Sequence, residues 1–173
     1  GGTMSLILAA TYPEDVYAMI NMSPNIAIND DKAWLLDKPW GLQIARLAIG
    51  GNTRTFPPEP EKDKFWNSSY RLESVTQLQE LIDSKMNTET FSKVKCPTLT
   101  LYYYKNEQEQ DPVVKVSAMM EMNSQLSTPD SLKVMVPIPN AGGHVLGSHV
   151  VSKDIESVVK AVLCRGGACG VEW

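Results

Sequence analysis

The chain has 173 residues, of which 43% are hydrophobic, and 20 acidic against 16 basic residues give it a formal net charge of −4. This length and composition predict one globular domain with a sizeable core. Because no basic block occurs anywhere, the charge argues against nucleic acid or an anionic membrane as the main partner. No apolar run approaches the ~18 residues of a membrane span, and no signal peptide opens the sequence. Since the sequence begins at Gly-Gly-Thr without an initiator methionine, these absences leave the compartment open.

The first part of the chain reads as a helix followed by a strand. GGTMSLILAATYPED predicts a short buried helix that ends before Pro13. VYAMINMSP is a compact apolar run ended by Ser23-Pro24, and it predicts a central parallel strand buried on both faces. A helix followed by a fully apolar strand is typical of an α/β sheet.

Residues 25–94 differ in character and predict an insertion between two strands, with helices of its own. LESVTQLQELIDSK has its apolar residues at helical spacing and predicts an amphipathic helix. FPPEPEKDK predicts an exposed turn or loop. Aromatic residues concentrate in this segment, namely Trp34, Trp40, Phe65 and Trp66.

The α/β alternation then returns. CPTLTLYYY predicts a strand, and the polar loop KNEQEQD leads to Pro112 as the first residue of a helix. SLKVMVPIP predicts a further strand, which Pro137 and Pro139 place toward the sheet edge. Ser152 is expected to cap a final helix. The apolar stripe of that helix consists of Ile155, Val158, Val159 and Val162.

The three cysteines, Cys96, Cys164 and Cys169, are widely spread and form no metal-type CxxC pair. Cys96 precedes Pro97 at the head of an apolar run and is predicted to be a buried thiol. Cys164 and Cys169 either pair with each other or stay reduced. The last ten residues, CRGGACGVEW, show no periodicity and are expected to form an irregular tail.

Two polar loops occupy equivalent positions, each after a strand and before a helix. One ends in Asp111, and the other holds His144, one of only two histidines in the chain. Because loops at the carboxyl ends of parallel strands converge, we expect this carboxylate and this imidazole to meet. Such a pair is the orienting acid and the general base of nucleophilic catalysis.

The order strand, Asp-Pro-Val-Val, helix, strand, Gly-His, helix resembles the C-terminal third of an α/β-hydrolase, in which the triad follows the order Ser, Asp or Glu, His. GGTMSLILAATYPEDVYAMINMSP likewise resembles the segment directly after the nucleophile elbow of that superfamily. The fold implied is α/β, with mostly parallel strands flanked by helices and a helical cap. The implied divisions are residues 1–24 and 95–163 for the hydrolase core, 25–94 for the cap and 164–173 for the tail.

The resemblance implies a serine hydrolase of the esterase or lipase type that needs no cofactor and no metal. His144 would act as the general base, Asp111 would orient it, and Trp34, Trp40 and Trp66 would line the acyl pocket. No G-x-S-x-G occurs in the chain, so the nucleophilic serine is expected upstream of Gly1. The implied partners are a small-molecule ester or acyl substrate, and either the missing N-terminal half or another copy of the chain.

Alternatives remain open at several of these residues. Asp111 before a proline is also a favoured N-cap, and Glu107 or Glu109 could supply the acid instead. His149 is expected to be a surface or capping residue. The tryptophans could simply pack the insertion against the core. For the whole chain, the alternative is a non-catalytic binding protein of the same fold, or a fragment that completes another chain.

Overall fold

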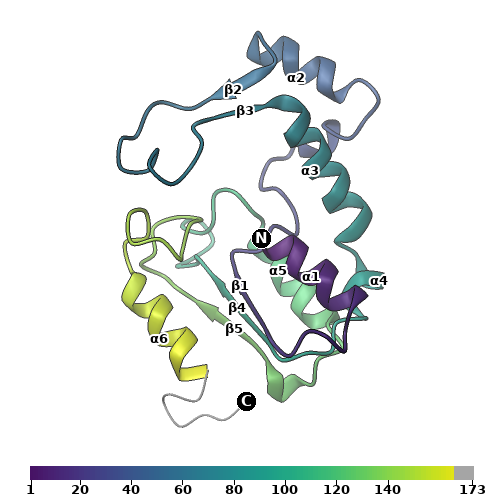
Figure 1. Cartoon of the computed structure of the whole chain (residues 1–173), viewed down its shortest axis with the longest axis vertical. Helices are drawn as coiled ribbons and strands as arrows, with labels where there is room; N and C mark the ends of the chain where they lie inside the picture. The colour runs from purple at the N-terminus through teal and green to yellow at the C-terminus, as the bar shows by residue number, and fades with distance from the viewer. Residues whose placement is uncertain (166–173) are drawn as a thin grey trace.

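A computed structural model of the chain describes residues 1–165. It contains a parallel sheet with helices on both faces, and a helical arm that extends away from one end of the sheet (Figure 1). The elements in chain order are α1 (Gly2–Thr11), β1 (Met19–Met22), η1 (Ala33–Leu35), α2 (Gly41–Ile49), β2 (Thr53–Thr55), β3 (Ser69–Arg71), α3 (Leu72–Lys85), α4 (Thr88–Phe91), β4 (Thr98–Tyr102), α5 (Val116–Gln125), η2 (Asp130–Leu132), β5 (Lys133–Pro137) and α6 (Ile155–Arg165).

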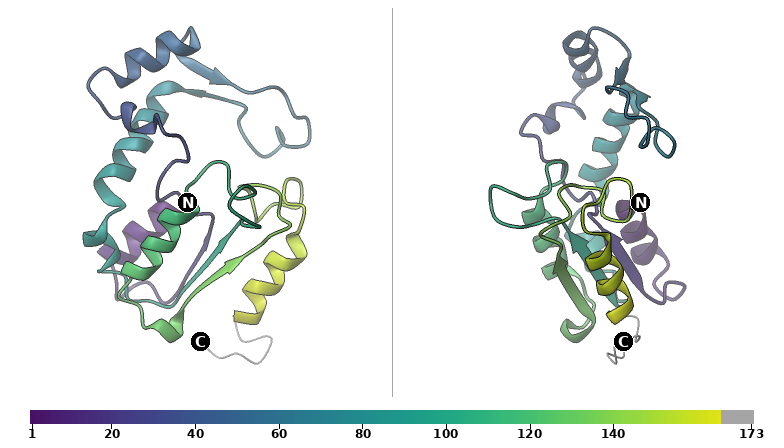
Figure 2. Two further views of the ribbon diagram at one scale, coloured as in Figure 1. Left: turned by 180° about the vertical axis from the view of Figure 1, so that it is seen from behind. Right: turned by 90° about the vertical axis from the view of Figure 1, so that its left-hand side faces the viewer.

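The sheet has the strand order β1-β4-β5, and both strand pairs are parallel. Its register pairs Met19 with Thr98, and Thr98 in turn with Lys133. Figures 1 and 2 show α6 on one side of the sheet and α1 and α5 on the other. The α/β class, the parallel strands and the flanking helices predicted from the sequence are therefore confirmed.

The central strand β4 is buried on both faces because each face contributes to a different core. Tyr102 packs in the cluster formed with α1, α4 and α5. Leu99 and Leu101 point the other way, into a cluster that includes Val158 of α6. This two-sided burial accounts for the β-branched and aromatic run predicted to be a strand.

The prediction that β1 is central and buried on both faces is wrong for the described part of the chain. Within residues 1–165, β1 lies at the edge of the sheet and pairs with β4 alone. Ile20 and Met22, on the same face as Leu99 and Leu101, are 45% and 40% exposed. Large apolar side chains at an open strand edge are typical of a surface that packs against another segment.

The insertion between β1 and β4 forms the arm at the top of Figure 1. It contains η1, α2, the antiparallel pair β2-β3 and α3, and ends at α4, which packs against α1 and α5. The helix predicted from LESVTQLQELIDSK is α3, with the bounds expected. The predicted exposed loop FPPEPEKDK lies in the connection between β2 and β3.

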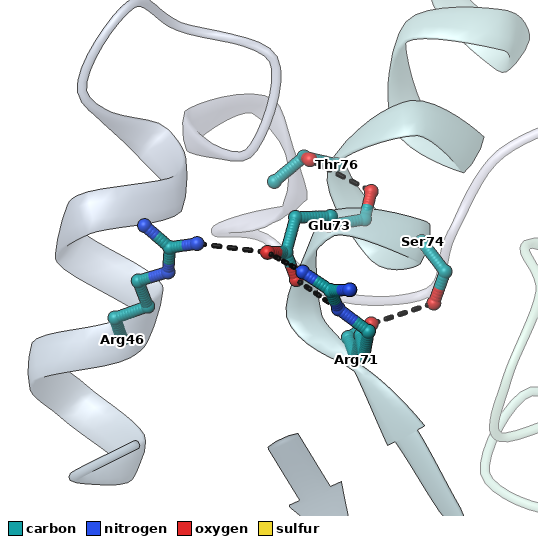
Figure 3. A network of polar contacts seen from close by, with 5 residues as sticks. All are labelled: Arg46, Arg71, Glu73, Ser74 and Thr76. Carbon is teal, nitrogen blue, oxygen red and sulfur yellow. Dashed lines mark hydrogen bonds and ion pairs between the residues drawn. The ribbon is translucent and has the colours of Figure 1, made fainter. Parts of the chain in front are cut away.

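A polar network joins α2 to the start of α3 (Figure 3). Arg46 and Arg71 each donate to Glu73 Oε1 at 2.8 Å. The hydrogen bond from Arg71 is the largest cause that lowers the pKa of Glu73, to about 2. The hydroxyl groups of Ser74 and Thr76 donate to the carbonyls of Arg71 and Glu73 at the start of α3.

Two predicted helix starts are wrong. Helix α5 begins at Val116 and not at Pro112, because Val114 instead forms an antiparallel bridge with Ile28. Helix α6 is capped by Asp154, whose Oδ1 accepts the Ser157 N–H at 3.2 Å, and not by Ser152.

The stripe predicted on α6 is partly correct. Val158 is buried and Ile155 and Val162 pack against the same core cluster, whereas Val159 is largely exposed. Helix α6 continues through Cys164 to Arg165, and the remaining tail, with Cys169, lies outside the described residues. Cys96 is a buried free thiol, as predicted, and burial raises its pKa.

Among residues 1–165, none of the helices combines the length and apolar character that crossing a membrane requires. The same residues hold no cluster of His, Cys, Asp and Glu side chains suited to a metal ion.

Candidate active site

Asp111 lies at the carboxyl end of β4 although a long polar loop separates the two in sequence. The loop folds back on itself, with an antiparallel bridge between Tyr104 and Gln110 and a hydrogen bond from Lys105 N to Glu109 O at 2.9 Å. The chain therefore returns to its starting point, and Asp111 N donates to Tyr103 O at 3.1 Å. The two ends of the loop therefore lie side by side. Asp111, the first residue after the loop, lies at the carboxyl end of the central strand β4.

The segment after β1 holds Asp111 from the other side. The Asn29 amide donates to Asp111 O at 3.1 Å, and Asn29 N donates to Val113 O at 2.8 Å. Asp111 Oδ1 accepts the N–H groups of Val113 and Val114 at 2.9 and 3.1 Å. The carboxylate thus satisfies two backbone donors in the manner of a cap, although no helix starts there, and its Oδ2 remains available.

The histidine loop, residues 138–154 between β5 and α6, is anchored at both ends. Ile138 N donates to Tyr102 O at 2.8 Å and continues the sheet pairing by one residue. Lys153 N donates to Ala141 O at 3.0 Å and closes the loop. Gly142 has φ +74°, and a Cβ there would lie 2.8 Å from the Lys153 side chain. One glycine of the Gly-Gly pair is therefore favoured by its backbone conformation, whereas the flexible Lys153 side chain could move away from a Cβ.

Asp111 and His144 meet as predicted. His144 Nδ1 lies 2.9 Å from Asp111 Oδ2, with the carboxylate fully buried and the imidazole 31% exposed. An ionised carboxylate only accepts hydrogen bonds, so Nδ1 carries the proton in this contact. The neutral ring then has its lone pair on Nε2, the nitrogen that a general base needs free.

The pKa of Asp111 reflects opposing effects. Burial raises it, but the hydrogen bond and charge of His144, together with the N–H groups of Val113 and Val114, outweigh burial and lower the pKa below its usual value. Asp111 is therefore ionised at neutral pH and its negative charge faces the imidazole.

This lowered pKa predicts a pH-dependent contribution of Asp111 to stability. An aspartate whose folded pKa is depressed stabilises the fold above its unfolded pKa of about 3.9, and the effect is lost as pH falls through the folded value. We expect Asp111→Asn to lower the free energy of unfolding at pH 7, and to lower it less below about pH 4. Urea unfolding of both proteins across this range measures the difference, with the exposed Asp15→Asn as the matched control. A loss of unfolding free energy in Asp111→Asn that is the same at every pH would contradict this contribution of the Asp111 carboxylate.

The alternative acids do not contact His144. Glu107 accepts the Tyr104 hydroxyl at 2.8 Å, and Glu109 pairs with Lys105 at 2.8 Å, both at the exposed loop tip. His149 is exposed, as expected, and its ring lies 6.3 Å from that of Phe65 in the insertion.

The three candidate tryptophans lie in different places. Trp66 is 38% exposed and lines a cavity together with Val145, the neighbour of His144. Trp34 lines a separate cavity between η1 and α3. Trp40 is 71% exposed and is the residue directly before α2.

Sequence reasoning missed residues that the structure adds to this region. Asn29, in a segment without a recognisable motif, holds the backbone of Asp111. Phe56 and Val145 lie with Trp66 around one cavity although they come from distant parts of the chain. No local pattern marks such residues, because their proximity arises from the packing of the insertion over the core.

The sequence matches no protein-family model and no curated protein. Solved structures are similar in fold. A metagenome-derived lipolytic enzyme described with LipS and LipT has a TM-score of 0.65 at 14% identity, covering 94% of this chain and 60% of its own. The monoacylglycerol lipase of Paleococcus ferrophilus has a TM-score of 0.64 at 13% identity, covering 94% and 63%. A soluble variant of Saccharomyces cerevisiae monoglyceride lipase has a TM-score of 0.59 at 12% identity, covering 92% and 60%.

These similarities extend over nearly the whole chain, which spans about 60% of the length of the solved structures it matches. They agree with the parallel sheet and with the helices on its two faces. The chain therefore has the fold of the α/β-hydrolase superfamily.

Proposed function

We propose that this chain belongs to a serine hydrolase that cleaves carboxylic esters or related acyl substrates, and that it supplies the acid and the base. The observation that carries the proposal is the pair of Asp111 Oδ2 and His144 Nδ1, 2.9 Å apart at the carboxyl edge of the sheet. The lipolytic enzyme and the two monoacylglycerol lipases that share the fold support an ester as substrate.

In this proposal the nucleophile is a serine in a segment outside these residues, joined to the start of α1. Figure 1 shows that the N-terminus of α1 lies near the same sheet edge as the acid and histidine loops. A Cβ on Gly2 would lie 2.6 Å from Pro24 Cβ, so a glycine there lets the helix start close to the end of β1. The positive end of the α1 dipole would favour the negative charge that develops on the substrate oxygen.

The end of β1, next to the start of α1, holds buried polar side chains without partners in the described part of the chain. Asn21 and Ser23 are buried, and their side-chain polar atoms have no hydrogen-bond partner among the described residues. Ser23 also has φ 45°, which is uncommon for a residue with a side chain. Buried polar groups are normally paired, so these unpaired atoms are an unusual feature of the end of β1.

The proposed reaction has two halves. The serine hydroxyl attacks the acyl carbon while His144 Nε2 takes its proton, and the collapse of the tetrahedral intermediate transfers that proton to the leaving alcohol. Water then attacks the acyl carbon while Nε2 takes one of its protons, and as the bond to the serine oxygen breaks Nε2 returns that proton to the serine, which releases the carboxylic acid. Asp111 stabilises the imidazolium in both halves, and no metal or cofactor takes part.

A fluorophosphonate that labels activated serines tests this function. The intact protein, meaning this chain with the segment that carries the nucleophile, is expected to hydrolyse methyl acetate and to gain one phosphonyl group. Peptide mass spectrometry should place the group on a serine outside this chain. The chain expressed alone is the control and should stay unlabelled. An intact protein that neither reacts with the probe nor turns over esters would favour the non-catalytic binding protein.

A further inference from the structure

A cavity of about 170 Å³ lies between the insertion and the histidine loop. Phe56, Pro57 and Trp66 form its apolar wall on the side of the β2–β3 connection, and Val145 forms the wall on the core side. Figures 1 and 2 show this connection extending toward the histidine loop at the carboxyl end of the sheet. Because Val145 follows His144 directly, its Cα lies ~3.8 Å from that of the proposed base.

The wall of the cavity is held in place by ring contacts. The ring centres of Phe56 and Tyr70 lie 5.7 Å apart, and the Arg54 guanidinium carbon lies 4.8 Å from the Phe56 ring centre. The Phe65 ring packs edge-on against two others. Its centre lies 6.1 Å from that of Trp66 and 6.3 Å from that of His149 in the histidine loop. The insertion is therefore attached to the loop that carries His144.

The charged groups around the cavity are already engaged. Lys62 Nζ pairs with Glu59 Oε1 at 3.0 Å, and Asp63 Oδ2 accepts the Glu59 N–H at 3.0 Å. These two acidic residues against one lysine leave no surplus positive charge for an anion. The cavity therefore suits a neutral apolar group and does not suit a carboxylate.

We propose that this cavity binds the apolar group of the ester, and that it selects a ring or a chain of about six carbons. The size follows from the volume, since an apolar cavity of about 150 Å³ holds a benzene ring. The inference rests on the proposed ester hydrolysis and adds its size selectivity. The bound group comes either from the acyl side or from the alcohol side, and the shared chemistry is a short neutral hydrocarbon.

Two ester series measured on the intact protein distinguish these sources. The first contains methyl esters of straight-chain acids from two to twelve carbons, and the second contains acetates of alcohols from one to twelve carbons, with benzyl acetate. In one series we expect kcat/KM to rise up to about fourfold per carbon as far as about six carbons, and then to level off or fall. Flat profiles in both series, with methyl acetate still turned over, would overturn the cavity assignment and leave ester hydrolysis standing.

Variants link the profile to the cavity. Val145→Phe fills the space and is expected to move the optimum to shorter chains, with at least a tenfold loss of kcat/KM on six-carbon esters relative to methyl acetate. Leu47→Phe makes a similar enlargement on the exposed surface of α2 and should leave the profile as it is. A Val145→Phe protein with the wild-type profile would refute the proposal.

Binding of hexan-1-ol gives a readout that needs no turnover. We expect hexan-1-ol to change the tryptophan fluorescence of the intact protein, and Trp66→Phe to abolish this change while Trp40→Phe retains it. Loss of the response in Trp40→Phe but not in Trp66→Phe would contradict the site. If hexan-1-ol binds through Trp66 but no ester is hydrolysed, the proposed function is refuted, and so is the ester selectivity inferred from it. Only the binding of a short hydrocarbon by the cavity would then stand.

Discussion

Replacing His144 with alanine is expected to lower the ester-hydrolysis kcat of the intact protein by roughly four to six orders of magnitude. The serine would then have no group to accept its proton, because Nε2 of this half-buried ring is the proposed base. KM should change far less, since the imidazole contributes to the transition state more than to substrate binding. Steady-state kinetics with methyl acetate measure both constants.

The second histidine provides the control for this experiment. His149 lies in the same loop but contacts Phe65 and not Asp111. His149→Ala is expected to keep kcat within a few-fold of wild type. Turnover close to wild type in His144→Ala would remove His144 from the mechanism.

Asp111→Asn is expected to lower kcat by about 10⁴-fold at neutral pH, as the loss of the orienting acid does in a triad. The asparagine can still accept the N–H groups of Val113 and Val114 through its oxygen, so the loop should keep its shape. Its NH₂ group would donate to His144 Nδ1, which moves the ring proton to Nε2 and blocks the base. Kinetics and unfolding of the same protein separate the two effects.

This substitution also separates the two interpretations of Asp111. If Asp111 only caps the backbone, the asparagine variant should retain activity, because it preserves the cap. Glu107→Gln and Glu109→Gln are the matched controls, since both carboxylates lie in the same loop and pair elsewhere. A large loss of kcat in either control, with Asp111→Asn active, would show that the acid is misplaced.

Much of the core could be predicted because its signals are local. The apolar run of β4 and the helical spacing in α3 each reflect burial of the segment's own residues. The meeting of Asp111 with His144 followed from chain order, since loops at the carboxyl ends of parallel strands converge. Prediction failed where tertiary contacts replaced local ones, as at Pro112, where pairing of Val114 with Ile28 delays the helix to Val116.

The sequence by itself determined the α/β alternation, the insertion, and His144 with an acidic loop as the two parts of the candidate acid–base pair. These depend on hydrophobic periodicity, turn residues and chain order, which a single sequence carries. Only the tertiary structure decided which carboxylate reaches His144, because the folded-back loop presents Asp111 and carries Glu107 and Glu109 away. It also decided that Trp66, and neither Trp34 nor Trp40, shares a cavity with the residue next to His144. Such proximity comes from the packing of the insertion against the histidine loop, which local patterns do not encode.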